Sequence, residues 1–168
     1  MEIKKAEIKT FCSVLIRVHK EHGLDKCADL FHKFIKENST RNILREIEEQ
    51  VFIEVQYNFG CTKELLRTSN KRKMVPEARA MCAILLHKHI NLSHDDISII
   101  FGRMISPSAV TKILKPFRLK LSGYDIVEHI GYNKLFTDEF VKKFHVMDQK
   151  ITSFKKSLIE TNTKKSKN

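Results

Sequence analysis

Residues 93–118 read SHDDISIIFGRMISPSAVTKILKPFR, and this stretch predicts two short helices joined by a tight turn. Ser93 with Asp96 three positions later is a variant of the capping box that begins a helix. Gly102 can supply the turn, and Ser106 followed by a proline places an N-cap before a residue suited to the first helical position. We therefore expect a helix-turn-helix, a layout that places its second helix in the major groove of DNA.

The second of these helices has an apolar and a basic face. Helical spacing directs four apolar side chains to the core, namely Val110, Ile113, Leu114 and Phe117. Between Arg103 and Lys120 there are five basic residues and no acidic one, whereas a solvated surface helix, the alternative interpretation, usually mixes signs. The residues predicted to contact DNA from this region are Arg103, Ser106, Ser108, Thr111, Lys112, Lys115 and Arg118.

A basic run precedes this region. The residues Lys71-Arg72-Lys73 come just before a helix that Val75-Pro76 is predicted to begin. A flexible basic arm can enter the minor groove, where the negative potential of DNA is deepest. The alternative is an ordinary solvated loop, and three adjacent basic residues are a weak signal. We include all three in the predicted DNA-binding set.

Several motifs between Glu48 and Phe117 occur in a recognisable order. They are VQYNFGCTKELL at residues 55–66, Lys71-Arg72-Lys73, Val75 with Arg79, Leu85-Leu86, Leu92-Ser93, Ile97, Phe101-Gly102 and Ser108-Ala109-Val110. In this order they resemble the C-terminal DNA-binding domain of the bacterial replication initiator DnaA. The resemblance implies a minor-groove role for Arg72 or Lys73, a phosphate contact for Arg79, and major-groove entry by residues 106–115.

The sequence departs from that family at the turn that reads bases. The family usually has Arg-Asp-His there, whereas this chain has Met104-Ile105-Ser106-Pro107 and a turn that is one residue longer. Lys112 stands where the family has a later histidine. We therefore expect a DnaA-like scaffold with a changed DNA target. The G-x-x-x-x-G-K-[ST] phosphate loop of the initiator's ATPase does not occur in this sequence, so we expect no bound nucleotide and no cofactor.

The whole chain of 168 residues is predicted to be all-α, because it is 42% hydrophobic and has only 5 Gly and 3 Pro. We expect an N-terminal helical extension at 1–47, the DnaA-like helix-turn-helix domain at 48–120, a C-terminal helical extension at 121–160 and a disordered basic tail at 161–168. Within the first extension, one helix is expected over 4–20, ending at His22-Gly23, and a second over 25–36. Residues 37–40 are predicted to form a turn before a third helix.

The last helix, expected from about Thr137, carries a heptad-like apolar stripe. Its members are Phe140, Phe144, Met147, Ile151, Phe154 and Leu158. Such a stripe can pack within the chain or pair two copies as a homodimer through residues 140–158, and both alternatives stay open. An exposed stripe would favour the rival function, a helical protein-interaction or structural protein that keeps the fold without reading DNA.

The net charge of +11 and the pI near 9.6 favour a polyanionic partner, and double-stranded DNA is the leading one. The alternative is merely a lysine-rich surface. RNA is less favoured, because no aromatic-rich sheet motif of an RNA-binding domain is present. We expect a role in replication or transcription control, and a phage or mobile element is a candidate source of the protein.

Other kinds of site have weak support in the sequence. The four cysteines lack C-x-x-C spacing and are predicted to be core residues. The histidines of His87-Lys88-His89 fall on different helix faces, which argues against a metal site with His94 and Asp95. No nucleophile and base have a local signature, so we expect no enzyme. Without a signal peptide or a membrane span, we expect a cytoplasmic, nucleoid-associated protein.

Overall fold

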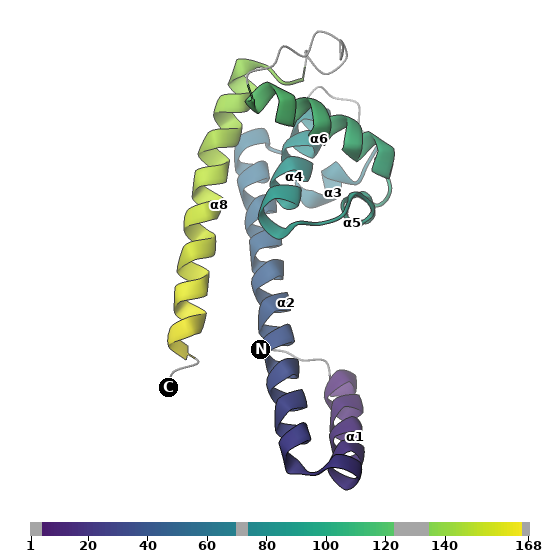
Figure 1. The fold of residues 1–168 in the computed structure, drawn as a ribbon. Helices are drawn as coiled ribbons and strands as arrows, with labels where there is room; N and C mark the ends of the chain where they lie inside the picture. Colours follow the sequence, from purple (N-terminus) through teal and green to yellow (C-terminus); the bar gives the residue numbers. More distant parts are fainter. Residues whose placement is uncertain (1–4, 70–73, 123–134, 166–168) are drawn as a thin grey trace. The chain divides into compact units, whose positions relative to one another are not determined.

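The structure is a computed structural model that describes residues 5–69, 74–122 and 135–165 (Figure 1). Its helices are α1 (Lys5–His22), α2 (Leu24–Phe59), α3 (Lys63–Leu66), α4 (Met74–Ile90), α5 (His94–Ile100), α6 (Pro107–Leu121) and α8 (Asp138–Lys165). No strand occurs in the described ranges, so the predicted all-α class is confirmed. Among the same residues, no helix has both the length and the apolar character that crossing a membrane requires.

The chain forms two compact units, Met1–Arg45 and Glu46–Asn168, and α2 contributes residues to both. The division lies close to the boundary expected at residue 47. The second unit contains the residues expected to form the DnaA-like domain and also α8, which lies in the part of the chain expected to be a C-terminal helical extension.

The first unit is a helical hairpin. Its turn lies at Gly23, which has a φ of 84° and whose N–H donates to the carbonyl of His19 across 3.1 Å. Because a positive φ strains residues that have a Cβ, glycine suits this position, and the predicted helix end is confirmed. Phe11 stacks between the two helices, with its ring centroid 3.8 Å from that of Phe34 and 6.2 Å from that of Phe31.

The prediction of a turn at residues 37–40 is wrong. The chain stays helical through these residues, and α2 runs without a break from Leu24 to Phe59. The stretch Glu-Asn-Ser-Thr contains neither glycine nor proline, and each of its residues costs only a few tenths of a kcal/mol in a helix interior. Good helix formers on both sides can outweigh this small cost. The helix α2 ends at Phe59, and Gly60 follows it at a φ of 63°.

The second unit is built around α4. Every residue from Ala80 to Leu86 is buried, which is almost two full turns, so all sides of this part of the helix are covered. The helices α3, α5, α6 and α8 contact it. The apolar residues at helical spacing, Ala78, Met81, Cys82, Leu85 and Leu86, are buried, but they are only part of a helix that is apolar on every side, as a central helix must be.

Helix α8 packs its stripe within the chain. The side chains of Phe140, Phe144, Met147 and Ile151 are buried, and Phe154 and Leu158 are half-buried. Lys150 of α8 also forms an ion pair of 3.1 Å with Glu54 of α2. Intramolecular packing therefore occupies the first part of the stripe, and a homodimer through residues 140–158 stays a prediction.

The prediction of a disordered tail at 161–168 is wrong for its first part, because α8 continues to Lys165. The sequence after Leu158 has no glycine or proline to end the helix. Residues 166–168 lie outside the described residues.

The four cysteines are free thiols that differ in exposure. Cys61 and Cys82 are buried, as predicted, and burial raises the pKa of both thiols. The prediction is wrong for Cys12, which is exposed because a two-helix hairpin buries only one face of each helix. Cys27 is half-buried, and its thiol donates to the carbonyl of Leu15 across 3.2 Å.

Candidate nucleic-acid interface

The helix α5 begins at the predicted capping box. The N–H of Asp96 donates to Oγ of Ser93 across 3.1 Å, and the N–H of Ser93 donates to the carboxylate of Asp96 across 3.2 Å. Two of the free N–H groups at the start of the helix are satisfied in this way. The carboxylate also lies at the positive end of the helix dipole, which favours it further.

The turn after α5 is fixed by two left-handed residues in succession. Gly102 has a φ of 61° and Arg103 a φ of 60°. The N–H of Arg103 donates to the carbonyl of Ser98 across 2.8 Å, and Oγ of Ser98 donates to the carbonyl of Ile105 across 2.7 Å. Ser98 is buried and holds both ends of the turn against α5. The turn expected at Gly102 is confirmed, and Arg103, a predicted DNA contact, is exposed on it.

The helix α6 starts where the sequence places it. Oγ of Ser106 accepts from the N–H of Ala109 across 3.2 Å, and Pro107 is the first helical residue. Oγ of Ser106 is also 2.8 Å from Oγ of Ser108, so the two hydroxyls form a hydrogen bond with each other. Ser106 therefore has a structural task as N-cap, while Ser108 is exposed at the start of the helix.

The two faces of α6 are those predicted. The inner face is buried and consists of Val110, Ile113, Leu114 and Phe117, together with Pro116 in the helix interior. The outer side chains of Ser108, Thr111, Lys112, Lys115 and Arg118 are exposed. No acidic residue occurs in the helix, and Lys120, half-buried near its end, forms an ion pair of 3.5 Å with Asp138.

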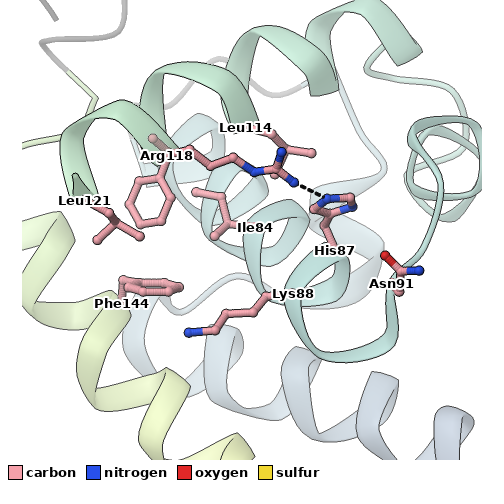
Figure 2. A pocket seen from close by; sticks show the side chains of 9 residues that line it. Ile84, His87, Lys88, Asn91, Leu114, Arg118, Leu121 and Phe144 are labelled. Carbon is pink, nitrogen blue, oxygen red and sulfur yellow. Dashed lines mark hydrogen bonds between the residues drawn. The ribbon is translucent and has the colours of Figure 1, made fainter. Parts of the chain in front are cut away.

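The side chains of Thr111 and Arg118 each contact a histidine. Oγ1 of Thr111 is 2.9 Å from Nδ1 of His94 and 3.2 Å from the carbonyl of Pro107. Nη2 of Arg118 is 2.6 Å from Nε2 of His87 (Figure 2). Neither histidine was assigned a role in DNA binding from the sequence, because the contacts join residues 17 and 31 positions apart and leave no local pattern.

Arg79 is used inside the fold. Its Nε donates to the carbonyl of Leu66 across 2.8 Å, and its Nη2 donates to the carbonyl of Thr68. Both carbonyls lie at the end of α3, so the guanidinium ties this short helix to α4. Partial burial lowers the pKa of Arg79 from its ordinary high value, and the side chain stays cationic. Lys71, Arg72 and Lys73 lie outside the described residues.

Arg67, which lies just after α3, contacts the end of α5. Its Nε donates to the carbonyl of Ile100 across 2.8 Å, at the C-terminal end of α5, where the helix dipole favours a cation. No local pattern singles out this arginine, because 33 residues separate the two partners.

The described residues hold no group of three or more side chains suited to a metal ion. His87 contacts Arg118 of α6, whereas Nε2 of His89 is 3.0 Å from the carboxylate of Asp148 on α8. The two histidines therefore serve different interfaces of α4.

No protein-family model, no curated protein and no solved structure matches this chain. The resemblance to the DnaA domain therefore rests on the motifs in the sequence alone.

Proposed function

We propose that this protein binds double-stranded DNA through the helix-turn-helix formed by α5 and α6. In this proposal α6 enters the major groove with its exposed face, as the second helix of such a motif does. The resemblance of residues 48–117 to the DnaA domain supports the same orientation. Replication or transcription control is the role we propose for such binding.

The observation that carries the proposal is the charge on the outer face of α6. Lys112 and Lys115 are exposed, and no described residue forms an ion pair or hydrogen bond with either ammonium group. Several other lysines of the second unit form ion pairs with carboxylates, for example Lys63 with Glu48, Lys88 with Asp148, Lys143 with Glu139 and Lys150 with Glu54. A cationic helix face without carboxylates attracts phosphates and releases their counterions.

The exposed hydroxyls of Ser108 and Thr111 lie on the same face as these lysines and are suited to hydrogen bonds with base edges. Both lie in the first half of α6, which is the part of a recognition helix that usually meets the bases. Arg103 at the turn and Arg118 near the end of the helix would contact phosphates on either side.

The test measures the binding of the full chain to random-sequence duplex DNA by fluorescence anisotropy over a range of salt concentrations. The double variant K112E/K115E is compared with K142E/K156E, which changes the formal charge by the same amount at exposed positions of α8. We expect K112E/K115E to weaken binding at least tenfold and K142E/K156E to weaken it much less. The slope of log affinity against log salt should fall by about two for K112Q/K115Q.

Equal losses for the two charge-reversal variants would show that net charge, and not the α6 face, governs the interaction. Wild-type affinity that does not change between low and moderate salt would end the proposal, because phosphate contacts always release counterions. The protein-interaction reading would then be favoured.

A further inference from the structure

A pocket of about 300 Å³ lies between α4, α6 and α8, next to the outer face of α6 (Figure 2). Its apolar wall consists of Ile84, Leu114, Phe117, Leu121 and Phe144, and its polar edge of His87, Lys88, Asn91 and Arg118. Pockets that bind small molecules have volumes of about 300–1,000 Å³ and combine an apolar lining with a few polar groups. This pocket therefore suits a small ligand.

The polar edge carries two cations and no acid. The charge of Lys88 is largely offset, because its ammonium is 2.8 Å from the carboxylate of Asp148. Arg118 has no acidic partner among the described residues, and its hydrogen bond to His87 uses one of the five guanidinium N–H groups. The remaining donors can bind a carboxylate, with the two parallel hydrogen bonds that guanidinium groups favour.

His87 holds this guanidinium in place. Its Nδ1 is 3.0 Å from the carbonyl of Leu92, which can only accept, so Nδ1 carries the ring proton. Nε2 is then the acceptor for Arg118, which can only donate. The ring is neutral in this arrangement and leaves the charge of Arg118 uncompensated. A cation positioned before the ligand arrives loses less conformational entropy on binding.

We propose that this pocket binds a small monocarboxylic acid with an aryl or branched aliphatic group. The carboxylate pairs with Arg118, and the apolar group enters the space between Ile84, Leu121 and Phe144. The apolar wall disfavours fully polar anions such as inorganic phosphate, because such an anion has no apolar group to contact the wall.

Binding of the acid does not depend on the proposed function, but the effect of the acid on DNA binding rests on it. Arg118 is also a predicted phosphate contact, and one guanidinium cannot fully serve a bound carboxylate and a DNA phosphate. The acid should therefore weaken DNA binding about fivefold, the effect of losing one charged contact.

The test titrates 3-phenylpropionate, 4-methylpentanoate and benzoate into the ¹⁵N-labelled full chain and follows the amide resonances. We expect saturable shifts around Ile84, Leu121 and Phe144 with at least one acid. The neutral analogue 3-phenylpropionamide should bind at least tenfold more weakly than its acid. The variant R118Q should lose at least tenfold in affinity, and K112Q, its matched loss of charge on the same helix, less than twofold.

A second variant, L121W, fills the pocket from an exposed position, since Leu121 is 43% accessible, and should abolish binding without disturbing the core. The proposal is overturned if no acid saturates at millimolar concentration, if the amide binds as well as the acid, if K112Q matches R118Q, or if L121W still binds. Acid binding without any wild-type DNA binding would instead refute the proposed function and leave the pocket standing.

Discussion

Arg118 donates a hydrogen bond to Nε2 of His87 across 2.6 Å, and the same imidazole donates from Nδ1 to the carbonyl of Leu92 across 3.0 Å. The histidine thereby links the end of α4 to α6 and to the segment that leads into α5. Residues of α4, of α6 and of the segment before α5 are thus joined through one ring. This link fixes a guanidinium that would otherwise be mobile on an exposed helix face.

We expect the two side chains to be energetically coupled. In a double-mutant cycle with H87F and R118Q, the coupling free energy should be about 0.5–1 kcal/mol, because exposure to solvent weakens a charged hydrogen bond. H87F alone should cost more than R118Q alone, because it also removes the donor to Leu92. Urea unfolding of the four proteins measures the cycle. Strictly additive effects would mean that the contact contributes nothing to stability.

Arg79 should act on stability and not on DNA affinity. Replacing it with methionine leaves the carbonyls of Leu66 and Thr68 without their donors, which should lower the free energy of unfolding by about 2 kcal/mol. The exposed Arg103 serves as control, since R103M should cost far less. Urea unfolding gives the free energies, and DNA binding is measured below the unfolding transition. A folded R79M protein with a reduced salt slope would restore the phosphate role that the DnaA resemblance implies.

His89 should make the protein less stable in mild acid. Burial lowers the pKa of its imidazole despite the carboxylate of Asp148, while Lys88 and Lys155 nearby lower it further. As the pH falls through about 6.5, the unfolded chain takes up a proton that the folded chain refuses. The free energy of unfolding therefore decreases until the pH reaches the folded-state pKa.

Urea unfolding at pH 7.5, 6.5 and 5.5 measures this dependence for the wild type and for H89Q, which keeps a donor for Asp148. The variant should lose less stability than the wild type between pH 7.5 and 5.5. Parallel curves would show that His89 does not contribute, and that other groups set the acid dependence.

The parts of the fold that could be predicted are those encoded by neighbouring residues. Ser93 with Asp96, and Ser106 with its proline, are local cap signals, so the starts of α5 and α6 were placed correctly. The false turn at 37–40 came from reading weak helix formers as a break, although only glycine or proline opposes a helix strongly.

Contacts between distant segments left no such signal. The sequence shows that Arg79 and Arg118 are cationic. It does not show that Arg79 donates to a carbonyl at the end of α3 or that Arg118 donates to His87. Phosphate contact and internal hydrogen bonding need the same residue type, so charge alone could not separate them. The pocket beside Arg118 was missed for a related reason, since three helices that are far apart in sequence form it.

The turn between α5 and α6 should respond oppositely to two substitutions. Gly102 at a φ of 61° has only the Cβ of Arg67 near the position of an added methyl, at 4.0 Å, so G102A meets backbone strain but no clash. We expect it to lower the free energy of unfolding by about 1–2 kcal/mol. Arg103 already bears that strain at a φ of 60°, so R103G should be neutral or raise stability by up to about 1 kcal/mol. Urea unfolding measures both, and a neutral G102A would mean that residue 102 is not left-handed in solution.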